Sequence, residues 1–170
     1  MKSRFIVIEG GDGAGKDTQI DLLKQIVPAD DYLFLFDPQS TEVGTRLREI
    51  IRFDERVSPT SELLLHLAAR VQLVEEKIVP ALHSGRSVVT NRFDLSTMAY
   101  QIYGRERLDM RDFLRNMSDF ALGGLRPDVV ILLDVPPEIG LRRAAKVGDV
   151  DKFDREKLAF HERVREGYLT

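Results

Sequence analysis

The chain has 170 residues, of which 43% are hydrophobic and 31% charged, so it is long enough for one buried core and too short for two. Its formal net charge of -3 excludes the broad positive surface of proteins that coat nucleic acid, and we expect no nucleic-acid partner. The absence of cysteine excludes a disulfide scaffold and a thiolate metal site. We therefore expect a single domain over residues 1–170.

The chain begins with a short apolar segment rather than a long one. Residues 5–8 are too few for the apolar part of a secretion signal or for a membrane span. Together with the lack of cysteine, this short segment predicts a cytoplasmic protein with no membrane partner.

Short apolar runs then alternate with helical patterns. Four runs, each bounded by turn residues, predict buried parallel strands: Phe5–Ile8, Tyr32–Phe36, Ser87–Thr90 and Val129–Leu133. Hydrophobic residues recur at helical spacing in two stretches between them: Ile20, Leu23 and Val27, then Leu64, Ala68, Val71, Val74, Ile78 and Leu82. Strands that alternate with helices need crossover connections. The pattern therefore predicts an α/β fold, a three-layer doubly wound parallel sheet with ligands at the carboxyl ends of its strands.

A glycine-rich loop, GGDGAGKDT, directly follows the first predicted strand. Its spacing matches the phosphate-binding pattern G-x-x-x-x-G-K-[ST] except at the last position, where the chain has Asp17. The dinucleotide pattern G-x-G-x-x-G fails, because Lys16 stands where the third glycine belongs. We expect the loop to bind the phosphates of a nucleotide through Gly10, Gly11, Asp12, Gly13, Ala14, Gly15, Lys16, Asp17 and Thr18. The alternative is a turn that caps a helix and leaves the lysine solvated.

With this loop in place, segments along nearly the whole chain resemble the thymidylate (dTMP) kinases, a family of P-loop nucleoside monophosphate kinases. The segments are, in the order of that family, FIVIEGGDGAGKDTQ, STEVGTRLREII, LLLHLAARVQLVEEKIVPAL, SVVTNRFDLSTMAYQ, RPDVVILLDVPPEIGLRR and FHERVREGYL. The resemblance implies the P-loop NTPase topology, ATP as donor, dTMP as acceptor, Mg²⁺ and a homodimer. Type I members have an arginine where this chain has Gly13, so the resemblance is to type II members.

The resemblance also implies an acceptor site. Its residues are Asp12, Gln39, His66, Arg70, Arg92, Thr97, Tyr100 and Gln101. The family's roles place Asp12 on the sugar 3′-hydroxyl, Arg92 on the acceptor phosphate and Arg70 on the thymine edge. Each has a plainer alternative, because Asp12 could complement a helix dipole and each arginine could be a surface ion-pair partner. An arginine within an apolar helix face is nevertheless costly without an anion.

Two helical neighbours complete that acceptor site. Tyr100 matches the tyrosine that crowds the sugar 2′ position and so selects deoxyribose, although a core tyrosine is the alternative. Thr97 and Gln101 lie one helical turn apart and would share the face that contacts the base.

Two departures from the family concern the acceptor. His66 stands where the family usually stacks a phenylalanine on thymine, so a modified or different pyrimidine is an alternative substrate. Gln39 stands near the place of a cation that often contacts the acceptor phosphate, and a neutral hydrogen bond there would bind phosphate more weakly.

A third departure concerns the metal. The family has a neutral hydroxyl in the loop and a carboxylate before the Arg92 position, whereas this chain has Asp17 in the loop and Asn91 before the arginine. A carboxylate about 4 Å from a phosphate oxygen would cost roughly 4 kcal/mol at an effective dielectric constant of 20, unless a cation lay between them. We therefore expect Asp17 to bind Mg²⁺ directly and Asn91 to orient a metal-bound water. An inactive relative that keeps the fold is the alternative.

The last features concern a lid, a segment over about residues 142–153. Type II members carry catalytic arginines there, and this chain offers Arg142, Arg143 and Lys146, with Ala145 and Val147 at other positions that are arginine in relatives. The expected catalytic residues are thus Lys16, Arg92, Arg142 and Arg143, and with fewer lid arginines we expect slower turnover. The alternative for the arginine pair of the lid is a solvated helix face.

The sequence ends at Thr170, where relatives of the family that it resembles usually continue with a further strand and helix. If nothing follows, the strand Val129–Leu133 would expose an edge. This shortness, the exchanged acid and the thinned lid keep a non-catalytic nucleotide-binding protein as the alternative of another class.

Overall fold

The computed structural model describes residues 2–54, 56–146 and 156–170. Its elements, in chain order, are β1 (Phe5–Glu9), α1 (Lys16–Ile26), β2 (Tyr32–Phe36), α2 (Glu42–Phe53), α3 (Pro59–Leu73), the π-helical turn η1 (Val74–Ile78), α4 (Val79–His83), β3 (Ser87–Asn91), α5 (Asp94–Thr97), the π-helical turn η2 (Met98–Gly104), the 3₁₀ turn η3 (Leu108–Met110), α6 (Arg111–Ala121), β4 (Val129–Leu132), α7 (Pro137–Ala144) and α8 (Leu158–Leu169). Within the described part of the chain, no helix is long and apolar enough to cross a membrane.

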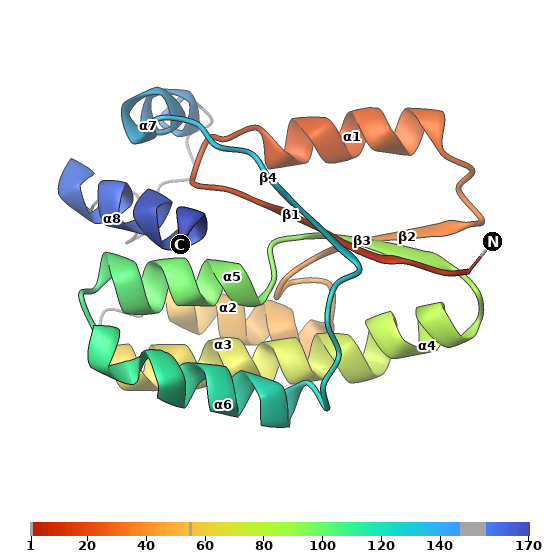
Figure 1. The fold of residues 1–170 in the computed structure, drawn as a ribbon, viewed down its shortest axis with the longest axis horizontal. Helices are drawn as coiled ribbons and strands as arrows, with labels where there is room; N and C mark the ends of the chain where they lie inside the picture. Colours follow the sequence, from red (N-terminus) through yellow and green to blue (C-terminus); the bar gives the residue numbers. More distant parts are fainter. Residues whose placement is uncertain (1, 55, 147–155) are drawn as a thin grey trace.

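The four strands form one parallel sheet in the order β2-β3-β1-β4. Helix α1 covers one face, and α2 to α6 cover the other (Figure 1). The α/β class with helices on both sides of a parallel sheet is therefore confirmed. Because the strands are parallel, Ile8, Phe36 and Asn91 lie in register near the carboxyl ends of their strands. The loops that follow β1, β2 and β3 consequently meet there.

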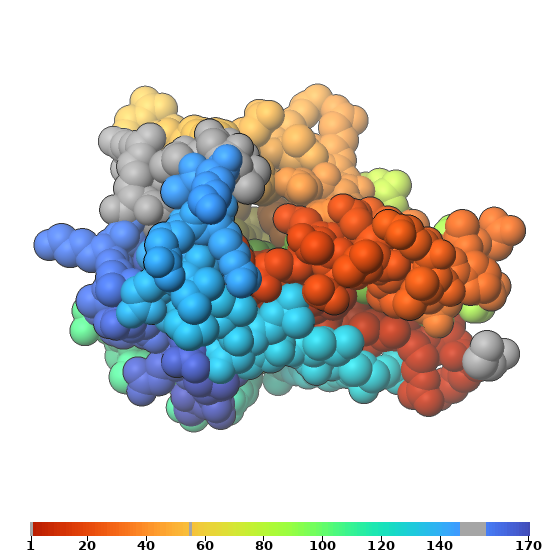
Figure 2. Space-filling model, turned by 90° about the horizontal axis from the view of Figure 1, so that it is seen from above, coloured from red at the N-terminus to blue at the C-terminus, as the bar shows by residue number. Residues whose placement is uncertain are grey.

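Strand β4 differs from the prediction of a buried strand and shows the exposed edge that was the alternative expectation. Its residues Val129, Val130 and Ile131 were expected to be buried, but they are 43–45% exposed. The reason is position, because β4 pairs only with β1 among the described strands and forms an edge of the sheet. In Figure 2 its cyan atoms run along the molecular surface. A continuous apolar run predicts a strand but does not say whether a neighbour covers both of its sides.

The long helical stretch also differs in detail. Helix α3 begins at Pro59, and the hydroxyl of Ser58 accepts a hydrogen bond from the N–H of Ser61. Leu64 and Ala68, expected on the buried face, are exposed, whereas the residues that are buried are Leu63, Leu67, Ala69 and Leu73. The segment is apolar around most of its circumference, so periodicity alone does not select the face. The π-helical turn that follows then shifts the register of Val74 and Ile78, which are buried as predicted.

Helix α8 packs against η2 at very short range. A Cβ on Gly104 would lie 2.6 Å from a ring carbon of Phe160, and one on Gly167 would lie 2.7 Å from the ring of Tyr103. Phe160 and Tyr168 of α8 join Tyr100 in a buried cluster. This packing holds the side chains of α8 directly behind the loop that follows β1.

Candidate active site

One cleft of about 1190 Å³ opens at the carboxyl ends of the strands. In Figure 2 a hollow lies between orange α1, blue α7 and the lighter orange segment that includes α2. Most of the predicted site residues line this cleft: Asp12, Gly13, Ala14, Gly15, Lys16, Asp17, Thr18, Gln39, His66, Arg70, Asn91, Arg92, Thr97, Tyr100, Gln101 and Arg143. The cleft exceeds the roughly 300–1,000 Å³ of a pocket for one small ligand, so it has room for two. Gly10, Gly11 and Arg142 are not among its lining residues.

The glycine-rich loop is arranged to present backbone N–H groups. Gly15 has φ +94°, a left-handed conformation that starts α1 without a side-chain cap. The first N–H groups of the helix therefore remain for a ligand. The Nζ atom of Lys16 donates to the carbonyl oxygens of Gly10 and Gly11 at 2.9 and 2.7 Å. Burial, reinforced by the nearby charge of Arg92, lowers the pKa of Lys16 to about 7.

The loop also touches α7 backbone to backbone. Gly13 has φ +66°, and a Cβ there would lie 1.9 Å from the carbonyl oxygen of Gly140. A Cβ on Gly140 would in turn lie 2.2 Å from the carbonyl oxygen of Asp12. An arginine at position 13, as type I members have, would not fit this contact.

Asp17 and Asn91 meet across the mouth of the cleft. The Nδ2 atom of Asn91 donates to Oδ1 of Asp17 at 2.6 Å. The other amide atom, Oδ1 of Asn91, is buried and has no hydrogen-bond partner among the described residues. A carboxylate and an orphaned amide oxygen are hard oxygen donors of the kind that Mg²⁺ takes, directly or through water. The residues present therefore fit the expected metal.

Arg92 and Asp12 form the centre of the group that was expected to bind the acceptor. Arg92 donates to Oδ1 of Asp12 at 2.6 Å and to Tyr168 at 3.0 Å, while the hydroxyl of Tyr100 donates to Oδ2 of Asp12 at 2.6 Å. Burial raises the pKa of Asp12, but the charges of Arg92 and Lys16 and the Tyr100 hydrogen bond outweigh it and hold the pKa below its usual value. Asp12 is thus ionised and already paired.

Glu9, which sequence reasoning missed, fixes the backbone that carries Arg92. Its carboxylate is fully buried and accepts from the N–H of Phe93 at 2.9 Å and from the hydroxyl of Ser96 at 2.6 Å. Arg92 itself has φ +68°, which is uncommon for a residue with a side chain and implies local strain. The signal available in the sequence was a carboxylate ending an apolar strand, which needs buried donors.

The buried guanidinium of Arg70 is paired with a carboxylate, that of Asp37. Its Nε donates to Asp37 at 2.7 Å, and both side chains are only 2% exposed. Its Nη2 donates to Thr97 at 2.8 Å and to the carbonyl of Phe93 at 3.0 Å. Nη1 of Arg70 and Oδ1 of Asp37 have no partner among the described residues, although both are buried. The ion pair of Arg70 with Asp37, an acid that sequence reasoning missed, thus leaves one donor on Arg70 and one acceptor on Asp37 unsatisfied at the cleft.

Two further predicted residues and two that were not predicted also line the cleft. Gln39 is exposed and His66 is half-buried, and both line the cleft. Arg48 and Arg52 of α2 line it as well, and sequence reasoning did not select them.

The two arginines of the expected lid differ. Arg143 is a lining residue, whereas Arg142 is exposed and its Nε donates to the carbonyl of Glu138 in its own helix at 3.1 Å. Residues 147–153 of the expected lid lie outside the described residues.

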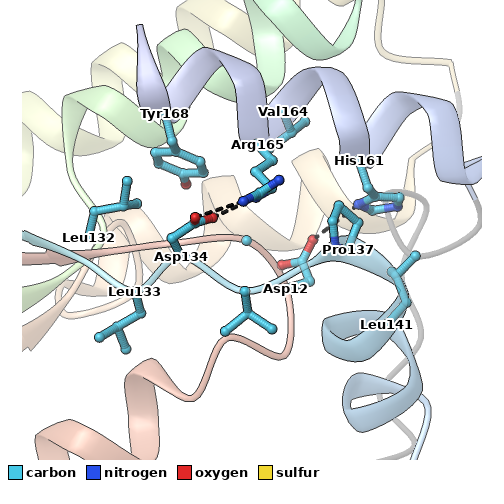
Figure 3. Close-up of a pocket in the computed structure, with 12 residues that line it drawn as sticks. Asp12, Leu132, Leu133, Asp134, Pro137, Leu141, His161, Val164, Arg165 and Tyr168 are labelled. Atoms are coloured by element: carbon cyan, nitrogen blue, oxygen red, sulfur yellow. Dashed lines mark hydrogen bonds and ion pairs between the residues drawn. The ribbon is translucent and has the colours of Figure 1, made fainter.

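A small second cavity of about 20 Å³ lies behind the loop, between β4 and α8 (Figure 3). Nδ1 of His161 is 3.9 Å from Oδ2 of Asp12, and its buried Nε2 has no partner among the described residues. Arg165 and Asp134 pair at the rim at 2.6 Å. The volume suits one water molecule, which would satisfy the imidazole.

Comparison with known proteins gives a consistent result. The family model described as thymidylate kinase matches residues 8–170. A curated thymidylate kinase of Carboxydothermus hydrogenoformans (strain ATCC BAA-161 / DSM 6008 / Z-2901) is 42% identical over 172 residues, which cover 99% of this chain and 84% of that protein. The crystal structure of thymidylate kinase from Ehrlichia chaffeensis aligns with a TM-score of 0.79 at 24% identity, over 99% of this chain and 86% of the other. That structure shows a shared fold, so the expected P-loop NTPase topology is confirmed.

Proposed function

Since the chain belongs to the thymidylate kinase family, we propose that it transfers the γ-phosphoryl group of ATP to the phosphate of dTMP, giving dTDP and ADP. The observation that carries this proposal is the single cleft lined by both the glycine-rich loop with Lys16 and the acceptor group around Arg92. A donor held at one end and an acceptor at the other would meet with their phosphates in line.

The chain's own residues would work by positioning and charge neutralisation. The loop N–H groups and Lys16 would hold the phosphates of ATP, and Lys16 would exchange its bonds to the carbonyls of Gly10 and Gly11 for bonds to phosphate. Arg92 would hold the acceptor phosphate, while Asp12 would accept from the sugar 3′-hydroxyl. No covalent intermediate is needed.

Asp17 and Asn91 would hold Mg²⁺ together with the phosphates. When bound, the ion would neutralise charge between the carboxylate and the triphosphate. Among the described residues no group of three or more His, Asp or Glu side chains gathers to hold a metal by itself. This arrangement suits Mg²⁺, which usually keeps several waters and binds through one or two protein oxygens plus substrate phosphates.

The lid over about residues 142–153 remains part of the proposal, within a single domain of residues 1–170. Arg143 already lines the cleft and would contact the transferring group, whereas Arg142 would first have to leave its carbonyl contact with Glu138. Closure over the phosphates would exclude water and so limit wasteful hydrolysis of ATP.

The base side of the cleft offers an unpaired donor to a pyrimidine base. The unpaired Nη1 of Arg70 is a pure donor, so it requires an acceptor such as a ring carbonyl oxygen. Tyr100 would crowd the sugar 2′ position while it holds Asp12. No contact among the described residues favours a modified pyrimidine over dTMP, although His66 lines the cleft.

A coupled assay of ADP release tests the proposal. We expect ADP to form only when ATP, dTMP and Mg²⁺ are all present. A protein that binds nucleotide but releases no ADP under these conditions would be the non-catalytic relative instead. Replacing dTMP by other pyrimidine nucleotides in the same assay would identify a different acceptor.

A homodimer and a cytoplasmic location complete the proposal. Exposed apolar side chains on the helices supply surface that a second copy would cover: Val43, Ile50, Phe53, Leu64, Phe113 and Phe120. Sedimentation velocity measures the assembly state directly. The absence of cysteine fits a reducing compartment.

A further inference from the structure

Gln101 is the most completely enclosed polar side chain that lines the cleft. It lies on η2, is only 1% exposed and has both ends of its amide in use. Its Nε2 donates to Oε1 of Glu62 at 2.5 Å, and its Oε1 accepts from Nε of Arg105 at 3.2 Å. Arg105 and Glu62 also pair with each other, at 3.1 and 3.3 Å. The three side chains form a triangle, and Nη1 of Arg105 also lies 3.9 Å from Oε1 of Glu156.

The chemistry of the two partners fixes which way the amide points. A carboxylate such as Glu62 can only accept hydrogen bonds, and a guanidinium such as Arg105 can only donate them. Turning the amide over would place its NH₂ against the guanidinium and its oxygen against the carboxylate. Both hydrogen bonds would become repulsions in a buried site, where an unpaired polar group is costly. Gln101 is therefore held in one orientation.

The locked amide has one donor and one acceptor left. A carboxamide carries two N–H groups and two lone pairs, of which the triangle uses one each. Because Glu62 and Arg105 are paired with each other, they share one edge of the amide, and the groups that remain point to its opposite flanks. One of them, the N–H or the oxygen, can therefore meet one polar group at the edge of a pyrimidine base. Thymine and uracil present a keto oxygen beside an N–H, whereas cytosine presents an amino group beside a ring nitrogen that accepts. A free amide would suit either base by turning over, and a locked one suits only one.

We propose that Glu62 and Arg105 are positioning residues that lock Gln101 and so make the site discriminate keto pyrimidines from cytosine. This proposal rests on the proposed function, because it assumes that the base of the acceptor lies against Gln101. Neither Glu62 nor Arg105 is among the residues that line the cleft, so we assign their effect on a bound base to the amide that they hold. The unpaired donor of Arg70 offers a further hydrogen bond to an acceptor of the same ligand.

The test compares dTMP with dCMP in Glu62→Gln, Arg105→Gln and the double variant. A neutral amide at either position can turn to match a flipped Gln101. We expect the ratio of kcat/KM for dTMP over dCMP to fall about tenfold in the double variant, the change that one misplaced neutral hydrogen bond produces, and less in each single variant. The fall should come from KM rather than kcat. Glu42→Gln, in an exposed ion pair with Arg46, is the matched control and should leave the ratio unchanged.

The outcomes separate this proposal from simpler ones. If the triangle were only structural, the variants would unfold at a lower temperature while the ratio stayed constant, and the proposal would fail. Arg105 is 20% exposed, so Arg105→Gln should fold even if the buried change does not. Dissociation constants for dTMP and dCMP, measured by calorimetry, give the same ratio without turnover. A wild-type protein that binds dTMP but makes no ADP would refute the kinase proposal alone, and unchanged ratios in an active enzyme would refute the lock alone.

Discussion

The acceptor side and the donor side of the cleft are built in different ways. On or behind the proposed acceptor side, three arginines already have a carboxylate partner: Arg92 with Asp12, Arg70 with Asp37, and Arg105 with Glu62. On the donor side the loop offers mainly backbone N–H groups, and Asp17 and Arg143 are exposed. The difference suggests that the acceptor is selected by fixed, directional hydrogen bonds, while the donor is held by charge and by the backbone of a loop.

The paired acceptor side also has a cost. A phosphate that approaches Arg92 meets the ionised Asp12 on the same guanidinium. Arg92 has further partners in Ser96 and Tyr168, so it can keep its position while it shares its charge with a ligand. Preorganisation of this kind lowers the entropy lost on binding but requires that ligand and carboxylate contact different N–H groups.

The largest expected effect comes from breaking the acceptor side at Arg92. Arg92→Met removes the phosphate contact and leaves Asp12 without its main cation, so we expect kcat/KM for dTMP to fall about 10²–10³-fold. We also expect a lower melting temperature, because a partly buried pair loses one partner. Arg46→Met, at an exposed pair on α2, is the control and should change neither quantity. Steady-state kinetics measure the change in kcat/KM, and thermal unfolding measures the change in melting temperature. Unchanged kinetics would show that the acceptor phosphate binds elsewhere.

The sequence predicted this half of the site only in part. The motifs identified Arg92, Arg70 and Tyr100, because guanidinium and phenol groups at those places match a known pattern. They did not identify Glu9, Asp37 or Glu62, whose partners lie far along the chain, for example 84 residues away in the case of Glu9 and Phe93. Which acid pairs with which arginine depends on the three-dimensional packing, and local spacing does not contain that information.

The fold shows the same limit. Alternating apolar runs and helical patterns predicted the strands to within a residue at their ends, since period and turn residues are local signals. The predictions that β4 would be buried and that Leu64 and Ala68 would lie on the buried face of α3 were wrong, since both properties depend on neighbours that lie far along the sequence. The expected partnership of Asp17 and Asn91 is different, because Asn91 ends β3 beside β1 and Asp17 follows the loop that leaves β1.

The second prediction breaks the donor side at Asp17. Asp17→Ala removes the proposed metal ligand, so we expect turnover at saturating ATP to fall about 10²-fold and the Mg²⁺ concentration for half-maximal rate to rise. Asp17→Ser combined with Asn91→Asp places a hydroxyl in the loop and a carboxylate on β3, and should recover most of the rate. Measuring the turnover rate of each variant as a function of Mg²⁺ concentration tests both expectations. An Asp17→Ala enzyme with the wild-type titration would exclude this carboxylate as a ligand.

The third prediction sharpens the comparison within the donor side. Arg143 lines the cleft and Arg142 bonds a carbonyl of its own helix, so they should contribute unequally. We expect Arg143→Ala to lower kcat about tenfold, the loss of one charge-assisted contact, and Arg142→Ala to change it less than about twofold. The two variants are controls for each other because they remove the same group from neighbouring exposed positions. Equal losses would mean that α7 turns on closure and brings both arginines to the phosphates.

The smallest expected effect is a proton taken up when the donor binds. Lys16 has a pKa of about 7 in the ligand-free protein, because it is buried against loop carbonyls and close to Arg92. Triphosphate favours the charged ammonium and raises that pKa, so at about pH 8 a lysine that is mostly neutral must bind about one proton as ATP binds. Titration calorimetry in buffers of different ionisation enthalpy measures this uptake. It should shrink at about pH 6, where Lys16 is already protonated, and vanish in Lys16→Arg, whose guanidinium stays charged. No uptake at about pH 8 in the wild type would show that the lysine is charged before ATP arrives, and that the loop already counters its burial without a ligand.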